Sequence, residues 1–377
     1  MNVFALSFAL MLALVLLELA VLKFSRGQAV PWKEVVFNLN SGNIMVWVFR
    51  GVEVLAFGLV LGHLSFDWVG RWPVLWQWVF AFIAWDFCFY WMHRLHHKLP
   101  LFWAVHVVHH QGEHFGLSLG IRNSWYSSLT NFPFIAGLAV LGVPLEIFVA
   151  VSSFHYGVQF YNHNALVNKS GFLDRILVTP SNHRVHHGTD PAYIDRNFGG
   201  TFLVWDKIFG SYQAERDDIP MRYGVTAGAG GAPSYNPLWA SNAGIFHWMR
   251  ARFPGLAKRK TFTVPGPYIG IAGVLLFGGT IYYVNHATAW AEAPRVALFA
   301  GLFFGTLAIG GMSDDKRWGL AGWVLVALGM PALFALHGGL GSPWAMALLL
   351  PLGLHGLDGA RRLALAAPVD PQARRSA

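Results

Sequence analysis

Charged residues and cysteine are both scarce in this chain of 377 residues. Only 12% of the residues are Asp, Glu, Lys or Arg, whereas 55% are hydrophobic, a balance far from that of soluble globular proteins. The single cysteine, Cys88, excludes an internal disulfide and any CxxC motif. The composition therefore predicts a membrane protein whose chemistry does not depend on thiols, with Cys88 acting as a small buried hydrophobic residue.

Acidic residues are outnumbered as well. The 27 Lys and Arg against 19 Asp and Glu give a net charge of +8, which fits either nucleic-acid binding or the excess of basic residues on the cytoplasmic side of membrane proteins. The basic residues lie outside the apolar runs, so we favour the membrane explanation and expect no nucleic-acid partner.

Long apolar runs predict an all-α, polytopic helical bundle, because a bilayer-spanning helix needs about 20 mostly apolar residues. The first run has no basic region before it and no small-residue cleavage site, which favours a retained helix over a signal peptide. Glu18 in this run is expected to face a neighbouring helix. The predicted runs lie near residues 3–22, 44–64, 73–91, 124–142, 145–163, 265–284, 296–312, 318–337 and 343–357.

Basic residues in the loops orient these runs. They follow the first and third runs and precede the sixth, so nearly all fall on one side, the cytoplasmic one, if the N-terminus is outside. The stretch from 164 to 260 lacks a convincing span and is predicted to form a polar, histidine-rich cytoplasmic cap. The expected parts are transmembrane helices with two histidine boxes (1–163), the cap with a third box (164–260), further transmembrane helices (261–360) and a disordered tail (361–377).

Histidine is abundant, with 17 residues that are clustered rather than scattered. Two boxes have the spacing i, i+3, i+4, and a third has the spacing i, i+4. On a helix these spacings place imidazoles about 5–6 Å apart on one face, where they can share a metal ion or flank a pair of ions. The boxes are His93 and His97; His106, His109 and His110; and His183, His186 and His187.

Eight imidazoles are too many for one tetrahedral zinc ion, and with His163 as a ninth they could supply two ions. Imidazole suits Fe, Zn, Cu and Ni, so the ligands alone do not name the metal. Location favours iron, because oxidation of an aliphatic lipid carbon requires O₂ chemistry at a redox metal, whereas a hydrolytic zinc pair has no need of helices at lipid depth. On the predicted topology all the boxes meet at one membrane face.

Ligating imidazoles usually need a carboxylate or carbonyl to fix their tautomer. Asp86, one heptad before His93, is one candidate, and a solvated or capping carboxylate is the alternative for each of them. His155, on the same side of its helix as His163, is a candidate pocket or ligand residue. The other carboxylates considered are Glu113, Asp190, Asp195 and Asp206; the histidines expected to be structural are His63, His96, His114, His247, His286, His337 and His355.

Three segments, 86–97, 103–110 and 180–188, resemble the fatty acid hydroxylase superfamily, also called the sterol desaturase family. With smaller matching stretches the resemblance covers roughly residues 80–215. Within the superfamily the chain is similar to the alkylglycerol monooxygenase group and its bacterial relatives, judging by the segments His-Arg-Val-His-His-Gly and Trp-Asp-Lys-Ile-Phe-Gly and by the additional helices after residue 265.

The resemblance implies a di-iron, all-histidine site that activates O₂ and hydroxylates an alkyl or acyl carbon of a membrane lipid. It also implies an external electron donor, with tetrahydrobiopterin as the reductant of the nearest group, and a bacterial inner membrane as the location. Glu113 and Arg122 match motif positions beside the site. Gly116 stands where relatives often have Asn, and Asn182 where they often have His, which bears on the substrate more than on the chemistry. The implied ligands are His93, His97, His106, His109, His110, His163, His183, His186 and His187.

Two other functions remain open. Desaturation by the same di-iron site would remove two hydrogens from the lipid instead of adding oxygen, and the sequence does not separate these outcomes. A metal transporter would need ionisable residues at mid-membrane in several spans. Here the boxes cluster at one face, and Glu18, Arg50 and Glu53 are the main deep charges, so transport is the more distant alternative.

Overall fold

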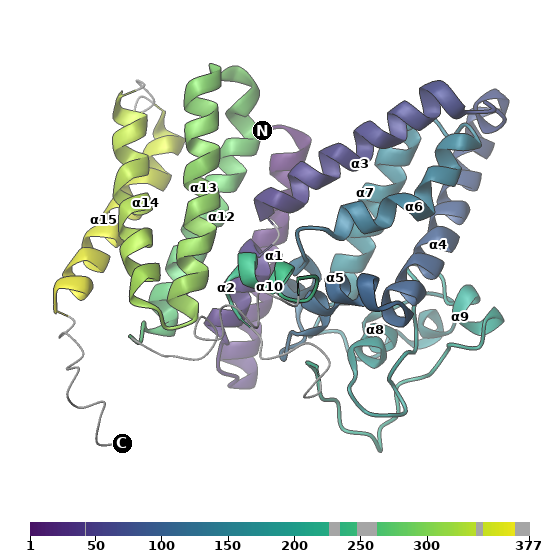
Figure 1. Cartoon of the computed structure of the whole chain (residues 1–377). Coiled ribbons are helices and arrows are strands. Elements are labelled where there is room, and N and C mark those ends of the chain that lie inside the picture. The colour runs from purple at the N-terminus through teal and green to yellow at the C-terminus, as the bar shows by residue number, and fades with distance from the viewer. Residues whose placement is uncertain (42, 226–233, 247–261, 337–341, 366–377) are drawn as a thin grey trace. The chain divides into compact units, whose positions relative to one another are not determined.

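The computed structural model describes residues 1–41, 43–225, 234–246, 262–336 and 342–365. Within these ranges the chain is helical, with one isolated β-bridge between Leu177 and Phe202, so the predicted all-α class is confirmed. The helices are α1 (Val3–Arg26), α2 (Trp32–Asn40), α3 (Asn43–Leu64), α4 (Val74–Lys98), α5 (Pro100–His110), α6 (Ser127–Val140), α7 (Leu145–Asn162), α8 (Pro180–His187), α9 (Val204–Ile208), α10 (Pro237–Asn242), α12 (Gly266–His286), α13 (Glu292–Ser313), α14 (Arg317–Leu336) and α15 (Pro343–Leu365), with 3₁₀ turns η1 (Val69–Arg71), η2 (Leu117–Ile121), η3 (Gly171–Arg175) and η5 (Ala287–Ala289) (Figure 1).

Every predicted apolar run coincides with a helix. In the described part of the chain, six helical segments are long and apolar enough to cross a membrane: α1, α2 with α3, α4, α12 with η5, α13 and α14. By contrast, α6 has only 14 residues, fewer than a bilayer span requires. At the other end, α15 continues to Leu365, five residues into the predicted disordered tail, and the rest of that tail lies outside the described residues.

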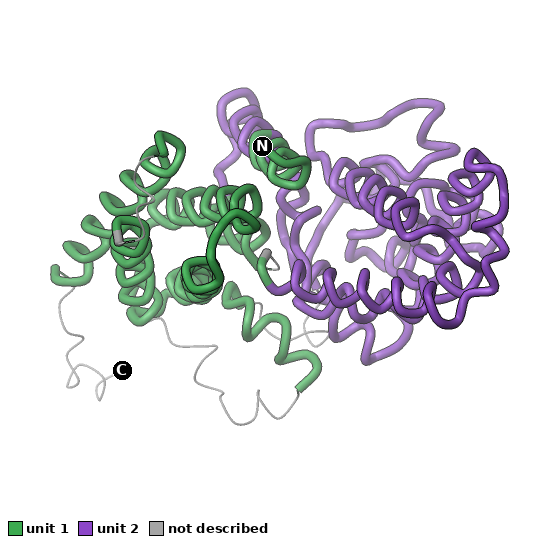
Figure 2. The backbone as a smooth tube through the Cα atoms, turned by 90° about the horizontal axis from the view of Figure 1, so that it is seen from above, with its two compact units in different colours: residues 1–13, 31–44, 234–377 green, residues 14–30, 45–233 purple. Residues whose placement is uncertain are grey.

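The chain divides into two compact units (Figure 2). Unit 1 contains residues 1–13, 31–44 and 234–377, and its described core is formed by α2 and α12–α15. Glycines let α2 approach α12 closely, because a Cβ atom on Gly270 would lie 2.5 Å from the Trp32 ring. His355 on α15 accepts a hydrogen bond from Trp323 Nε1 on α14 at 2.9 Å and stacks on Tyr268 of α12. It therefore holds three helices together, in line with the structural role expected for it.

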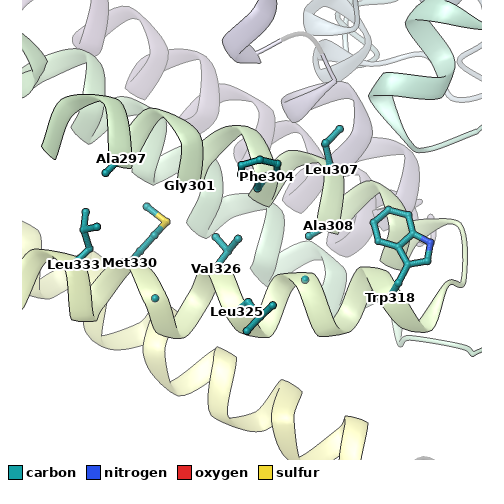
Figure 3. A pocket seen from close by; sticks show the side chains of 12 residues that line it. Ala297, Gly301, Phe304, Leu307, Ala308, Trp318, Leu325, Val326, Met330 and Leu333 are labelled. Carbon is teal, nitrogen blue, oxygen red and sulfur yellow. The ribbon is translucent and has the colours of Figure 1, made fainter. Parts of the chain in front are cut away.

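An apolar groove of about 560 Å³ lies between α13 and α14 of unit 1. Figure 3 shows Phe304, Leu325, Val326 and Met330 along it, with the Trp318 indole at one end. Its described lining contains no carboxylate, imidazole or thiol group.

Unit 2 contains residues 14–30 and 45–233 and holds all the predicted histidine boxes. Its core forms where α3, α4, α6 and α7 pack; for example, the rings of Phe57 and Phe148 stack 3.9 Å apart. The short connection between α6 and α7 turns at Gly142, whose φ of +86° favours glycine. This helical layer carries α5, η2, η3, α8 and α9, whose loops surround the histidines.

Candidate metal centre

The end of α4 and three later elements bring the predicted histidines together. α4 ends at Lys98, and the extended backbone of Leu99 with Pro100 at the first position of α5 reverses the chain, so that the first two boxes face each other. α8 likewise begins with proline, at Pro180, and His163 caps the end of α7. Eight of the nine predicted ligands therefore lie on helices, and the ninth lies directly after one.

The nine histidines form two adjoining clusters made of histidine alone. In each cluster, the candidate ligand nitrogens lie within 4.8 Å of one another. All three boxes contribute to the first cluster, while His163 joins members of the second and third boxes in the second. The first cluster is His93, His97, His106, His110 and His186, and the second is His109, His163, His183 and His187.

Within each cluster the Nε2 atoms approach one another at distances typical of ligands that share an ion. His106 Nε2 lies 3.1 Å from that of His93 and 3.2 Å from that of His110, and His163 Nε2 lies 3.1 Å from that of His183. Two nitrogens each about 2.1 Å from one ion would lie about 3.0 Å apart at a right angle and about 3.4 Å apart in a tetrahedron. The observed separations fall between these values, so each cluster has the dimensions of a metal site.

Hydrogen bonds on the far side of two rings, those of His109 and His163, place a lone pair on each Nε2 atom. His109 Nδ1 donates to the Arg122 carbonyl oxygen at 2.9 Å, and His163 Nδ1 donates to that of Gln159 at 2.7 Å. With the single proton of each neutral ring on Nδ1, two lone pairs face each other 3.2 Å apart at Nε2. Such an arrangement is repulsive unless a cation lies between them, so the donor set fits a bound metal.

His97 gives a second indication of a metal in the first cluster. Its Nδ1 lies 3.5 Å from the Asp195 carboxylate, and its Nε2 is buried without a hydrogen-bond partner among the described residues. The hydrogen bond from His97 and the nearby Lys98 ammonium lower the pKa of Asp195 to about 2. Asp195 is thus a predicted carboxylate that lies directly beside one of the nine predicted ligands.

The histidines beyond the spanning helices are held in their neutral, metal-binding form. Burial lowers the pKa of His109 to about 4, and burial together with neighbouring histidines holds the pKa of His187 well below its usual range. Positive charge is therefore disfavoured at these rings when no metal is bound, and little proton competition remains at neutral pH.

A loop with unusual backbone geometry orients two further ligands. Its residues Asp195 and Asn197 adopt φ angles of +60° and +54°, a conformation that Asp and Asn tolerate better than most residues. The loop then points the Arg196 carbonyl at His186 Nδ1, 2.9 Å away, and the Phe198 carbonyl at His93 Nδ1, 3.0 Å away. Main-chain oxygens thus set the tautomers of four of the nine rings, where the sequence suggested carboxylates.

The predicted carboxylates Asp206 and Asp86 act one layer further out. Asp206 is fully buried and accepts from the main-chain nitrogens of Phe198 and Gly199 at 2.8 Å. It thereby fixes the loop of residues 195–198, called the carbonyl loop below. Asp86, midway along α4, accepts from His155 Nε2 at 2.7 Å and also from backbone amides and an indole of the segment after that loop. The other donors to Asp86 are Thr201 N, Phe202 N and Trp205 Nε1.

The remaining predicted site residues differ in their surroundings. Arg122 is buried, its guanidinium donates to the Val108 carbonyl of α5, and its own carbonyl orients His109. Glu113 is exposed on the loop after α5. Glu18 faces loop amides instead of the expected neighbouring helix, accepting from Leu117 N and Ala165 N. The reason is that backbone amides in loops and at the start of a 3₁₀ turn need an acceptor, whereas amides inside a helix already donate to helix carbonyls.

Several other predicted residues lie outside the two clusters. His155 pairs with Asp86, and His96 bonds Thr130 Oγ1 at 2.8 Å, which fits a structural role. The carboxylate of Asp190 accepts from Ala192 N, as a capping residue would. His63 and His114 are exposed, and His286 stacks on Trp290. His247 and His337 lie outside the described residues.

Gly200 offers a direct test of this packing. A Cβ atom there would lie 2.1 Å from His155 Cε1, so Gly200→Ala should displace His155 from Asp86 and cost about 1–3 kcal/mol of stability. Thermal unfolding of the detergent-solubilised protein would measure the loss. Gly157→Ala is the matched control, because no atom lies within 4 Å of the added methyl group and alanine in a helix gains up to about 1 kcal/mol. Equal melting temperatures for the two variants would show that the contact is not tight.

Comparison with known proteins finds a family that matches this region. Residues 78–211 match the fatty acid hydroxylase family, close to the range of roughly 80–215 that the sequence resemblance covers. The chain is similar to alkylglycerol monooxygenase of Danio rerio, with 34% identity over 57% of this chain and 48% of the relative. It is similar to alkylglycerol monooxygenase of Caenorhabditis elegans, with 38% identity over 60% of this chain and 46% of the relative.

A bacterial relative is more distant. The ornithine lipid hydroxylase of Rhizobium tropici is 27% identical over 40% of this chain and 46% of its own length. The chain thus spans about half the length of the curated relatives it matches. No solved structure matches it.

Proposed function

We propose that this chain, which carries a fatty acid hydroxylase domain at residues 78–211, is a membrane di-iron monooxygenase that hydroxylates an alkyl- or acyl-chain carbon of a lipid. The observation that carries the proposal is the pair of buried, all-histidine clusters with converging Nε2 lone pairs. In the balanced reaction, a lipid C–H group, O₂, two electrons and two protons give the alcohol and water. Bound iron would supply the O₂ activation.

The residues of the chain have separate tasks in this proposal. The nine histidines hold two iron ions, and the carbonyls of Arg122, Gln159, Arg196 and Phe198 keep four of the rings in the ligating tautomer. Burial of the clusters excludes bulk water, which would otherwise intercept a reactive oxidant. The predicted residues Asp86 and Arg122 act as positioning residues for these groups.

The substrate class follows from the relatives and the membrane character of the chain. The relatives are named for alkylglycerols and ornithine lipids, and the first histidine box lies at one end of the apolar helix α4. A lipid would enter between helices with its reacting carbon just below the headgroup level. If that carbon adjoins an ether oxygen, hydroxylation gives a hemiacetal, which breaks down to an aldehyde and an alcohol.

The electron donor and the orientation also belong to the proposal. The sequence has no flavin or dinucleotide fingerprint, so electrons would come from an external reductant, for which tetrahydrobiopterin is the candidate suggested by the alkylglycerol monooxygenase resemblance. The basic loops favour a cytoplasmic active site, and the resemblance to bacterial members favours an inner membrane.

Elemental analysis of the detergent-purified protein tests the proposal first. We expect about two irons per chain, one for each histidine cluster, and O₂-dependent formation of an alcohol or aldehyde from a lipid mixture. Product analysis by mass spectrometry separates hydroxylation from desaturation, because only hydroxylation inserts an ¹⁸O atom from labelled O₂. Zinc instead of iron after anaerobic purification, or no metal at all, would contradict the proposal.

A further inference from the structure

The part of unit 2 expected to be a polar cap exposes a group of large apolar side chains. Phe172 and Ile208 are 68% and 63% exposed, and Leu173, Ile176 and Val204 are also exposed. Apolar residues scattered singly over a surface are ordinary, whereas a contiguous patch marks an interaction site. These five residues, on η3 and α9 and the turn after η3, are called the η3/α9 patch.

Backbone pairing holds the two segments of the patch side by side. Leu177 and Phe202 form the isolated β-bridge, and Leu203 N donates to the Ile176 carbonyl at 2.9 Å. The Lys207 ammonium on α9 also bonds the Arg175 carbonyl at the end of η3. The patch is therefore one surface formed by two sequence segments.

The segment that carries α9 docks on α4, a predicted membrane span. Trp205 Nε1 donates to Asp86 at 2.9 Å, and the rings of Trp205 and Phe87 lie 5.0 Å apart. Asp86 lies five positions before the end of the predicted apolar run 73–91, or about 8 Å at 1.5 Å per residue. Segment 202–208 is thus docked well inside the end of a helix long enough to cross the bilayer.

The charged side chains of the two segments are also arranged as a membrane contact requires. The acidic residues of both segments point inward: Asp206 is fully buried, and Asp174 accepts from Ser170 N and Thr179 Oγ1. The basic residues Arg175 and Lys207 are exposed. The outer face therefore combines large apolar side chains with positive charge, the combination with which interfacial segments bind anionic lipids.

We propose that the η3/α9 patch is embedded in the bilayer leaflet beside α4, with its apolar side chains among the acyl chains and with Arg175 and Lys207 at anionic lipid phosphates. The occupant is lipid rather than protein, because Trp205 of the α9 segment contacts Phe87 on α4, a span whose Ile83 and Phe87 are themselves exposed. This surface brings acyl chains next to the segment whose loop orients His93 and His186. The inference concerns membrane contact and does not depend on the identity of the metal.

Site-directed spin labelling in nanodiscs tests the proposal. In a Cys88→Ala background, single cysteines are introduced as Leu173→Cys and Ile208→Cys, with Asp217→Cys as the control at a side chain that is 88% exposed. The nanodiscs contain equal parts of phosphatidylcholine and phosphatidylglycerol. The quantity compared is the ratio of label relaxation by O₂ to label relaxation by a water-soluble nickel chelate. This ratio should be roughly threefold or more higher at positions 173 and 208 than at position 217.

Two outcomes would overturn the proposal. Labels at 173 and 208 that are as accessible to the nickel chelate as the label at 217 would place the patch in water. Labels shielded from both O₂ and nickel would mean that protein, not lipid, covers it. Thermal unfolding of the same samples shows that the labelled chains are folded. Iron content is measured separately, and a failure of the oxygenase proposal would appear there and not in the accessibilities.

Discussion

Replacing His109 with alanine is expected to reduce the iron content from about two ions per chain to about one. Lipid oxidation should fall by more than about 100-fold, because loss of a ligand should cost more than the change of a group that only positions a ligand, which costs about 10–100-fold. The second cluster would keep only three histidines, and the Arg122 carbonyl would lose its donor. Elemental analysis and product formation at saturating lipid and reductant would measure both effects.

His355→Gln is the matched control for this experiment. His355 is also buried and hydrogen-bonded, but it lies in unit 1 between Trp323 and Tyr268. Glutamine can both accept and donate at that position, so iron content and turnover should stay unchanged. If His109→Ala kept both irons and normal turnover, the assignment of the second cluster as a metal site would be wrong.

Asp86→Ala is expected to have the largest effect on stability. The carboxylate accepts four hydrogen bonds in a fully buried position, and its removal leaves buried donors without partners, at a cost of about 3–5 kcal/mol. The segment after the carbonyl loop would lose its attachment to α4. The iron affinity should therefore fall as well, by about 10–100-fold.

Thermal unfolding measures the first effect, and a competition titration with an iron chelator measures the second. The control is Asp217→Ala, which removes an exposed carboxylate paired with Lys169 and should change stability by less than about 0.5 kcal/mol. A purely structural role for Asp86 would lower the melting temperature and leave the iron affinity of the folded protein unchanged. Unchanged stability and affinity would show that neither the burial nor the hydrogen bonds of Asp86 matter.

The sequence predicted the helices and the grouping of the histidines because both depend on local periodicity. Apolar runs of span length became helices, and histidines three or four residues apart lie on one side of α5 and α8. The sequence did not predict how the nine divide: His109 and His110 are neighbours, yet they belong to different clusters. Neighbouring residues on a helix point about 100° apart, so adjacent histidines can reach two different ions.

The groups that orient the rings were harder to predict. The sequence analysis sought carboxylates, but most of the acceptors are main-chain oxygens, which every residue has and no residue type marks. Asp195 and Asn197 carried a usable signal, since both tolerate the left-handed conformation that aims their loop. His155 could be placed near the site from its spacing to His163, but its partner Asp86 lies 69 residues earlier and is met only through tertiary packing.

Because main-chain oxygens orient these rings, the effect of such a residue on the neighbouring ring does not depend on which side chain it carries. Gln159 and Arg196 hold His163 and His186 through their carbonyls, so this contact would survive a change of either side chain as long as the backbone path is kept. Such positions border the histidine clusters without their side chains orienting the rings. On the proposed function, a lineage could therefore alter the walls around the clusters, and with them the lipid that is accepted, while the nine histidines are inherited intact.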